Sequence, residues 1–355
     1  MEELTSLERC RRVVRRQRPD RVPRAAAFTP AVYEKFRAAT GEQDPHTYFR
    51  MDGVGVGPSG TSSQPDFRAW HRQDLPENAW FDEWGTGYTP GSMHHFTKYW
   101  FPLERAETVE DLESYPWPDF DNPSRYNHLA EQVEQLHWAG HFVMGTVGHI
   151  FETSWEVRKM EKLFEDFFER PEFATALLDR ITELRRAMAV NQAAAGVDMV
   201  SCGDDIGMQD RLMMSPDLWR KWFKPRWQSL WASVKKVNPD CSLFYHSDGA
   251  IEPVIADLIE IGVEVLNPVQ PECMDQQKLK RNYGDKLAFW GCIGTQSTMP
   301  FGTPSEVEAS VRWCIENLGG DGGLFITPTH VLEPEVPWEN IAALFAACDK
   351  YGAYS

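Results

Sequence analysis

Short apolar runs of five to eight residues recur beyond residue 140, and a helical pattern separates each run from the next. Strands that alternate with helices of this length need crossover connections, which build a parallel sheet. With AAAF near residue 25 and DGVGVG from residue 52, the number of strands approaches eight. We therefore predict an α/β fold, a (β/α)8 TIM barrel. The six runs are HFVMGTVG (141–148), VDMVSCG (197–203), SLFYHS (242–247), VEVLNPV (263–269), LAFWGCI (287–293) and GLFIT (323–327).

An open, doubly wound sheet is the alternative architecture. No GxGxxG or Walker lysine loop follows any of the runs, so the usual nucleotide-binding signature of that fold is missing. We predict one domain over residues 1–355. Within it, residues 1–24 form an N-terminal helix and extension, and residues 68–126 form an aromatic-rich, lid-like insertion with hairpins and a proline-rich connector.

Two helix starts can be located from their capping residues. Thr303, Pro304 and Glu306 combine an N-cap, a first-turn proline and a capping-box acid, and Gly319 marks the end of that helix. Ser215 and Pro216 begin another helix, which Pro225 is expected to kink.

Charge and cysteine usage exclude several classes of protein. The chain has 53 acidic and 36 basic residues and a net charge of -17, which disfavours binding to nucleic acid or to an anionic membrane. Its most apolar stretch, 138–151, contains His141 and His149 and is shorter than the ~20 residues of a membrane span. Seven scattered cysteines without a CxxC pair, and a start that does not resemble a signal peptide, predict a cytoplasmic protein.

Polar residues follow four of the predicted strands directly. In a (β/α) barrel the loops at the carboxyl ends of the strands build the active site, so these residues are candidates for function. Each has a structural alternative when taken alone, because an aspartate after a strand is often a helix cap and an asparagine often stabilises a turn. Together they favour a shared site. They are Asp204, Asp205 and Gln209, then His246 and Asp248, then Asn267 and Gln270, and finally His330 and Glu333.

The His-x-Asp spacing of His246 and Asp248 is suited to metal binding. In an extended segment, side chains two residues apart point the same way, so both can reach one ion. With His330 from another strand, the set has two imidazoles, one carboxylate and an open fourth position, as in catalytic zinc sites. His94 and His95, in the insertion, form a less suitable pair, because adjacent residues seldom share an ion.

The segments FYHSDGAIEPVIADLIEIGVEVLNPVQ, LAFWGCIGTQSTMPFGTPSEVEASV and GGLFITPTHVLEPEVPWENI resemble the uroporphyrinogen decarboxylase superfamily, and its cobalamin-linked methyltransferase branch in particular. The resemblance implies a (β/α)8 barrel. In the zinc methyltransferases, a His-x-Cys pair and a distant cysteine bind the metal. This chain matches the histidine at His246, and has Asp248 and His330 where the two cysteines would stand.

The resemblance implies a zinc-dependent transfer of methyl from a small methylated compound, a methyl ether or aromatic methoxy compound, to the cobalt of a separate corrinoid protein. It also implies a homodimer. Asp204 or Asp205 would orient a metal ligand or protonate the leaving oxygen. Glu152 would act with them, as a catalytic residue from the loop after an earlier strand. The predicted substrate contacts are Asn267, Gln270, Gln209, Arg158 and Trp290.

Two other functions remain alternatives. The first is a metal-free decarboxylase acting on a tetrapyrrole or another carboxylated substrate. Its arginine-rich RQAGRY-like motif is absent here, and RVPRAAAFTP stands in its place. The second is a binding module on an inherited barrel, which would bind a ligand without turnover.

Overall fold

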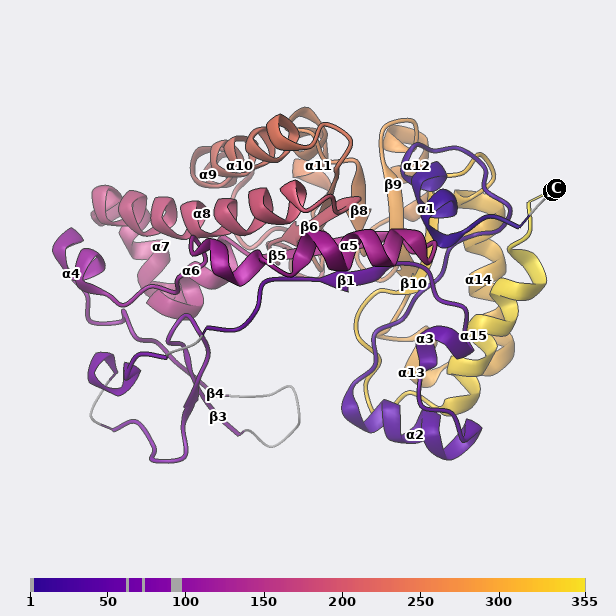
Figure 1. Cartoon of the computed structure of the whole chain (residues 1–355), viewed down its shortest axis with the longest axis horizontal. Coiled ribbons are helices and arrows are strands. Elements are labelled where there is room, and N and C mark those ends of the chain that lie inside the picture. Colours follow the sequence, from indigo (N-terminus) through magenta and orange to yellow (C-terminus); the bar gives the residue numbers. More distant parts are fainter. Residues whose placement is uncertain (1–2, 62–63, 72–73, 91–97, 355) are drawn as a thin grey trace.

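The computed structural model describes residues 3–61, 64–71, 74–90 and 98–354 (Figure 1). Its strands are β1 Val54–Val56, β2 Trp80–Phe81, β3 Gly87–Thr89, β4 Lys98–Trp100, β5 Val143–Gly148, β6 Met199–Gly203, β7 Ser242–His246, β8 Val265–Asn267, β9 Ala288–Ile293 and β10 Leu324–Pro328. Its helices are α1 Ser6–Val14, α2 Pro30–Thr40, α3 Pro45–Tyr48, α4 Val109–Ser114, α5 Leu129–Trp138, α6 Phe151–Arg158, α7 Met160–Glu169, α8 Pro171–Ala194, α9 Pro216–Trp222, α10 Lys224–Val237, α11 Glu252–Glu260, α12 Gln276–Tyr283, α13 Thr298–Phe301, α14 Pro304–Leu318 and α15 Trp338–Tyr351, with short 3-10 turns at Phe67–Trp70 and Pro123–Tyr126.

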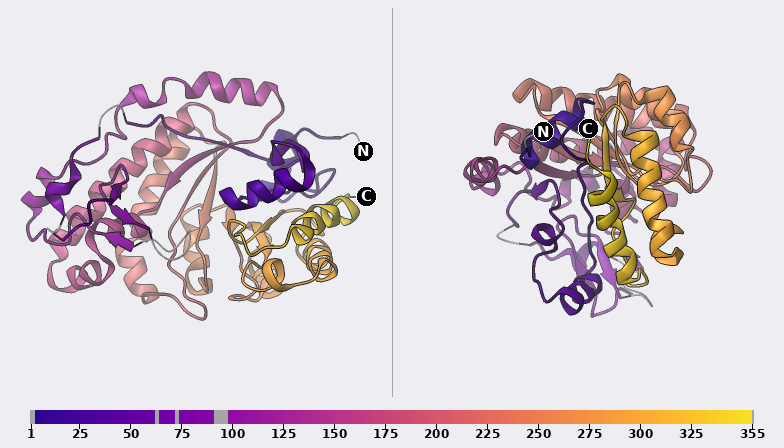
Figure 2. Two further views of the ribbon diagram at one scale, coloured as in Figure 1. Left: turned by 90° about the horizontal axis from the view of Figure 1, so that it is seen from below. Right: turned by 90° about the vertical axis from the view of Figure 1, so that its right-hand side faces the viewer.

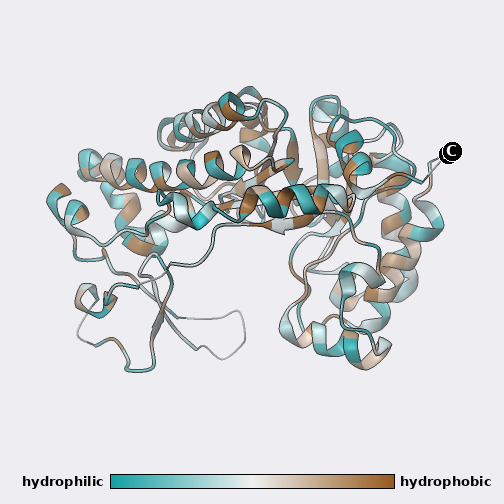
Figure 3. Cartoon of the chain, viewed as in Figure 1, coloured by the Kyte–Doolittle hydropathy of each residue, from teal (hydrophilic) through white to brown (hydrophobic). Residues whose placement is uncertain are grey.

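Seven parallel strands form the central sheet in the order β1-β5-β6-β7-β8-β9-β10. Five of the six predicted apolar runs contain one of these strands, the sixth covers all of β10 except Pro328, and DGVGVG contains β1. Helices follow most of the strands and cover the outside of the curved sheet (Figures 1 and 2). The central strands are mainly hydrophobic, whereas the surrounding helices alternate hydrophobic and hydrophilic turns (Figure 3). The predicted α/β TIM-barrel class is confirmed.

The segment around Arg24 takes the eighth position in the barrel. On one side, the Ile326 N–H donates to Pro23 O (2.9 Å) and the Ala25 N–H donates to Ile326 O (3.2 Å), which joins the segment to β10. On the other side, the Asp52 N–H donates to Arg24 O (2.7 Å), just ahead of β1. The predicted strand near residue 25 is therefore a single parallel bridge, and it links the two edges of the seven-stranded sheet.

Helix α1 covers the amino-terminal end of the barrel. Its Cys10, Val13 and Val14 side chains are buried in one cluster with the inward-facing side chains of the strands. The Leu7 N–H donates to Gly140 O (2.8 Å), immediately before β5. The amphipathic helix expected near the N-terminus thus completes the barrel core, and the opposite, carboxyl-terminal end is left for a functional site.

The insertion contains a three-stranded antiparallel sheet, β2-β3-β4, as the hairpin prediction required. In Figure 1 this sheet lies at the lower left and helix α2 at the lower right, both below the central strands. His94 and His95, the alternative metal ligands, lie outside the described residues. A lid function for the insertion remains a prediction.

The capping signals located the helices correctly. Helix α14 begins with the capping box of Thr303 and Glu306, and Gly319 is its C-cap. The helix that starts at Ser215 breaks at Phe223 into α9 and α10, so Pro225 begins a new helix instead of kinking one. In the part of the chain that the structure describes, no helix has the length and apolar character needed to cross a membrane.

Asp52 binds the segment around Arg24 that links the two edges of the seven-stranded sheet. Its carboxylate accepts hydrogen bonds from Arg9 Nη1 (2.7 Å), Arg21 Nη1 (2.7 Å) and the Arg24 N–H (3.1 Å), and its side chain is 1% exposed. We expect Asp52→Ala to lower the free energy of unfolding by about 3–5 kcal/mol, because the substitution leaves two arginines without their buried partner. Urea denaturation measures this change.

Glu34→Ala is the matched control, because Glu34 also pairs with an arginine, Arg37, but both side chains are exposed (72% and 44%). Exposed ion pairs contribute less than about 1 kcal/mol. Equal effects of the two substitutions would contradict the role assigned to Asp52.

Candidate functional site

Five polar side chains form a row along the carboxyl ends of β5, β6, β7 and β8. They are His149, Glu152, Asp205, His246 and Asn267. Glu152 Oε2 lies 2.7 Å from His149 Nδ1 and accepts the Asp205 N–H (3.0 Å). Asp205 Oδ1 lies 3.3 Å from His246 Nε2, and His246 Nδ1 bonds to Asn267 Oδ1 (2.5 Å). The register that pairs Gly203 with His246, and His246 with Asn267, brings these side chains together.

Asp205, His246 and Asp248 form a group whose ligand atoms all lie within 4.8 Å of one another. The Asp248 N–H donates to Asp205 Oδ1 (2.8 Å), which holds the two aspartates side by side. Asp248 Oδ1 is buried, and no described residue donates a hydrogen bond to it. An unpaired buried carboxylate oxygen is costly, so Asp248 Oδ1 is the atom of this group that a bound ligand would stabilise most.

The charges in this group depend on one another. Burial would lower the pKa of His246, but the hydrogen bond and charge of Asp205 raise that pKa to about 9. Burial opposes ionisation of Asp205, but His246 lowers the pKa of Asp205 below its usual value. Burial also raises the pKa of Asp248. A divalent cation fits here, because two carboxylates and one imidazole are suitable ligands and the cation would neutralise the adjacent negative charges.

His330 is not part of this group, which corrects the predicted set of His246, Asp248 and His330. Asp205, expected to be catalytic, stands in its place. Beyond Pro328, the Thr329 N–H donates to Ile293 O (2.9 Å) and the Leu332 N–H donates to Ala27 O (2.8 Å). His330 is exposed there, although it lines the same cavity as His246.

Asp204 caps a helix. Its Oδ1 accepts the backbone N–H groups of Ile150 (2.8 Å) and Phe151 (2.6 Å) at the start of α6, and its Oδ2 accepts Trp227 Nε1–H (2.9 Å). A carboxylate at a helix N-terminus satisfies otherwise unpaired donors and interacts favourably with the helix dipole. Because Asp204 is fully buried, its geometry supports the structural alternative over proton transfer.

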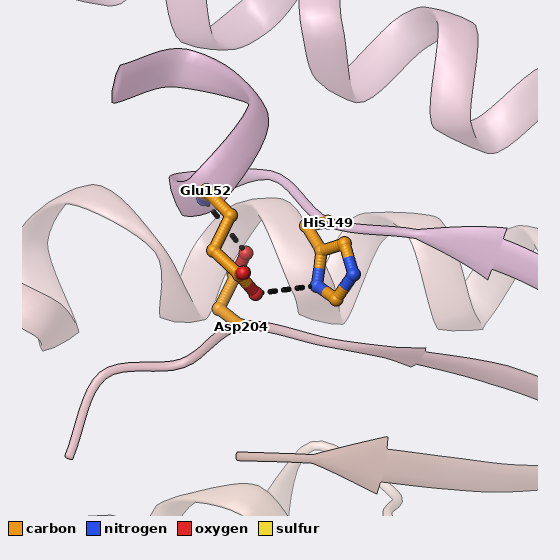
Figure 4. A group of neighbouring side chains, drawn as sticks. All are labelled: His149, Glu152 and Asp204. Carbon is orange, nitrogen blue, oxygen red and sulfur yellow. Dashed lines mark hydrogen bonds and ion pairs between the residues drawn. The ribbon is translucent and has the colours of Figure 1, made fainter. Parts of the chain in front are cut away.

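His149, Glu152 and Asp204 form a second compact group (Figure 4). Its ligand atoms already have protein partners: His149 Nδ1 contacts Gly203 O (2.8 Å) as well as Glu152, and both oxygens of Asp204 are occupied. This group is therefore a less suitable cation site than the one at Asp248. His149 was not among the predicted site residues, although its place directly after a predicted strand was the signal available.

A cavity of about 390 Å³ opens beside His246 at the carboxyl end of the barrel. Its surface is mostly apolar, with Trp290 stacked on Phe325 at 4.2 Å between ring centroids. No lysine or arginine is among the described residues that line it. The lining residues are Ala25, Ala26, Ala27, Met144, Ser201, Phe244, His246, Asn267, Trp290, Thr327, Pro328, Thr329, His330 and Val331.

The predicted substrate contacts separate into two groups. Trp290 and Asn267 line the cavity. Gln270 and Gln209 stabilise loops instead, since Gln270 Oε1 accepts the Gly249 N–H (2.6 Å) and Gln209 Nε2–H donates to Glu272 O (3.0 Å).

Arg158 lies in the protein interior, which does not support its predicted contact with substrate. It is fully buried, and its Nε–H donates to Asp166 Oδ2 (2.7 Å). Further donors are taken up by backbone carbonyls, including that of Ala106 at 2.8 Å. Its position near the end of α6 directs this side chain into packing with α7 and the connector.

Comparison with known proteins identifies the family. Residues 102–351 match the family model described as uroporphyrinogen decarboxylase (URO-D). The chain belongs to the uroporphyrinogen decarboxylase family. Over 200 residues it is 30% identical to a methylcobamide:CoM methyltransferase, MtaA, from Methanosarcina barkeri, which covers 56% of this chain and 52% of that protein. Over 180 residues it is 23% identical to a uroporphyrinogen decarboxylase from Pelodictyon phaeoclathratiforme, with 50% and 49% covered.

The chain spans about half the length of these curated relatives. A solved structure, a methyltransferase from Methanosarcina mazei, matches 98% of this chain and 99% of its own with a TM-score of 0.71 and 19% sequence identity. That match supports the family's barrel fold for the whole chain.

The stability of the folded protein should depend on pH through Glu156, which is half-buried on α6. Burial, with a contribution from the charge of Glu152, raises the pKa of Glu156 to about 8 from 4.5. The folded protein therefore holds a proton that the unfolded chain releases, and stability falls as pH rises from about 4.5 to 8. We expect Glu156→Gln to be close to wild type at pH 5 and more stable by roughly 1–3 kcal/mol at pH 8.

Urea denaturation of both proteins at the two pH values measures this difference. Glu134→Gln on the exposed face of α5 is the control, and should change stability little at either pH. A stability difference between Glu156→Gln and wild type that does not grow with pH would contradict the shifted titration.

Proposed function

We propose that this protein is a metal-dependent methyltransferase that moves a methyl group from a small methylated compound to the cobalt of a corrinoid carried by a separate protein. The two Methanosarcina barkeri relatives, 30% and 26% identical to this chain, support methyl transfer that involves a cobamide. We also infer a cytoplasmic location, because all seven cysteines are unpaired.

The observation that carries the proposal is the unpaired Asp248 Oδ1 within the group of Asp205, His246 and Asp248, beside a mostly apolar cavity. Zinc suits the donors in this group, and three protein ligands leave a coordination position for a substrate oxygen. His330, which lines the same cavity, is the nearest candidate for an additional ligand.

Each side chain has a defined task in the proposed reaction. A cation bound at Asp248 would supply Lewis-acid stabilisation of the departing oxygen, worth several kcal/mol. The O–CH3 bond would break with its electron pair left on oxygen, and the cobalt(I) of the partner would supply the pair for the new cobalt–methyl bond. His246 lowers the pKa of Asp205 against the effect of burial, which suits a ligand better than a proton donor. The apolar walls around Trp290 and Phe244 would bind the rest of an uncharged methyl ether and exclude water.

The proton for the leaving oxygen is best supplied by His149. Burial opposes its ionisation, but the hydrogen bond to Glu152 raises the pKa of His149 above its usual value. Its side chain is 37% exposed at the rim, whereas Asp204 is fully buried. Glu152 would then act by orienting His149 and by holding the backbone of Asp205.

A decarboxylase acting on a substrate with several carboxylates is less well supported. Such a substrate calls for cationic side chains in the pocket, and the described residues that line the cavity include neither lysine nor arginine. Asp205 and Asp248 would also repel the carboxylates of such a substrate.

The first test is metal content. We expect freshly purified protein to hold about one zinc per chain, and Asp205→Ala, His246→Ala and Asp248→Ala each to bind zinc at least tenfold more weakly. His330→Ala is the informative comparison, because His330 lies outside the group and should change the affinity less than any of the three. Elemental analysis and zinc titration measure these outcomes.

Circular dichroism of each variant confirms that the barrel persists. The proposal fails if the wild-type protein binds no metal, or if the three substitutions leave its affinity unchanged.

The second test is removal of the metal. Dialysis against a chelator should abolish methyl transfer to a corrinoid protein, and added zinc should restore it, because the leaving oxygen loses its stabilisation. The assay follows the change in the corrinoid absorption spectrum with a panel of methoxylated compounds. Turnover of a tetrapyrrole that survives the chelator would favour the decarboxylase instead.

A further inference from the structure

Asn267 links two neighbouring strands at the rim of the cavity. It is the last residue of β8, between His246 at the end of β7 and Trp290 in β9. Its Oδ1 bonds to His246 Nδ1 (2.5 Å), and its Nδ2–H donates to Trp290 O (2.7 Å). One carboxamide group therefore connects a proposed metal ligand to the backbone of the barrel.

The orientation of this carboxamide follows from its partner in β9. A backbone carbonyl can only accept a hydrogen bond, so the atom of Asn267 that faces Trp290 O must be the donor, Nδ2. The oxygen Oδ1 then faces His246 Nδ1. Since Oδ1 can only accept, Nδ1 must carry a hydrogen, and in the neutral imidazole the lone pair is on Nε2.

Nε2 is also the nitrogen that faces the proposed cation site. It lies 3.3 Å from Asp205 Oδ1, within the group that includes Asp248. We propose that Asn267 is a positioning residue: its carboxamide, anchored on Trp290 O, keeps the hydrogen of His246 on Nδ1 and presents Nε2 to the cation. This inference rests on the proposed function, and the substrate contact of Asn267 stays a prediction.

The anchor for Asn267 is rigid. Trp290 stacks on Phe325 and makes an edge contact with Phe244 at 5.7 Å between centroids. At Gly291 the backbone has a φ of 133°, and a Cβ built there would lie 2.2 Å from Pro268 O. Only glycine permits that approach of β9 to the segment after Asn267, so the carbonyl of Trp290 has a fixed place.

A titration with Co²⁺, followed by its visible absorption, tests the inference without any turnover. We expect Asn267→Ala to weaken Co²⁺ binding 10- to 100-fold, because a histidine ligand loses the group that orients it. Asn267→Asp keeps an acceptor for His246 Nδ1 but loses the donor to Trp290 O, so it should bind Co²⁺ more tightly than Asn267→Ala and more weakly than wild type. Equal losses in the two variants would overturn the role of the acceptor, as would wild-type affinity in Asn267→Ala.

Asn317→Ala is the matched control. Asn317 also donates through Nδ2 to a carbonyl, that of Trp313 (2.8 Å), and accepts a hydrogen bond from Gln277 (3.1 Å), but it is exposed on α14. Its replacement should leave Co²⁺ binding unchanged. Thermal unfolding of the metal-free proteins shows that each variant is folded.

A second measurement needs no substitution at Asn267. In the zinc-loaded wild-type protein with ¹⁵N-labelled histidine, NMR should show His246 protonated at Nδ1, with Nε2 bound to the metal. Protonation at Nε2 would overturn the inference while leaving the metal site intact. If the wild-type protein binds neither Co²⁺ nor zinc, the proposed function fails, and this inference with it.

Discussion

The register of three neighbouring strands determines where the functional groups meet. Gly203 in β6 pairs with His246 in β7, which pairs with Asn267 in β8, so the three strands end at one level. A Cβ at Gly203 would lie 2.1 Å from His246 O, so this close pairing depends on glycine. Beyond the strand ends, the Asp204 N–H donates to His246 O (3.0 Å), which carries the register into the loop that holds Asp205.

That register concentrates negative charge at one end of the barrel. Asp204 accepts hydrogen bonds from helix N–H groups and an indole, although burial still raises its pKa to about 7, and Glu152 pairs with His149 and accepts the Asp205 N–H. At Asp248, by contrast, Oδ1 is buried without a described donor. The unpaired oxygen distinguishes Asp248 from the neighbouring carboxylates Asp204 and Glu152, whose partners are protein groups.

The opposite end of the barrel has a structural role. Helix α1 fills it with apolar side chains, and Asp52 ties the closing segment to two arginines. Packing at the amino end and polar groups at the carboxyl end is the usual division in barrel enzymes. Because packing at the amino-terminal end stabilises the fold, the carboxyl-terminal end can hold charged groups that are unfavourable for stability.

The sequence by itself determined the alternation of strands and helices, the capped start of α14 and the strand ends from which the site is built. These features could be predicted because apolar periodicity and capping are local properties of the chain. Tertiary structure alone decided which polar residues meet. Asp204 and Asp205 are adjacent in sequence, yet one turns into a helix terminus and the other toward His246. His330 and Arg158 were assigned to the site from their positions along the chain, but His330 is not in the group of Asp205, His246 and Asp248, and Arg158 is buried against Asp166. Such outcomes depend on contacts between residues far apart in sequence, which local pattern does not encode.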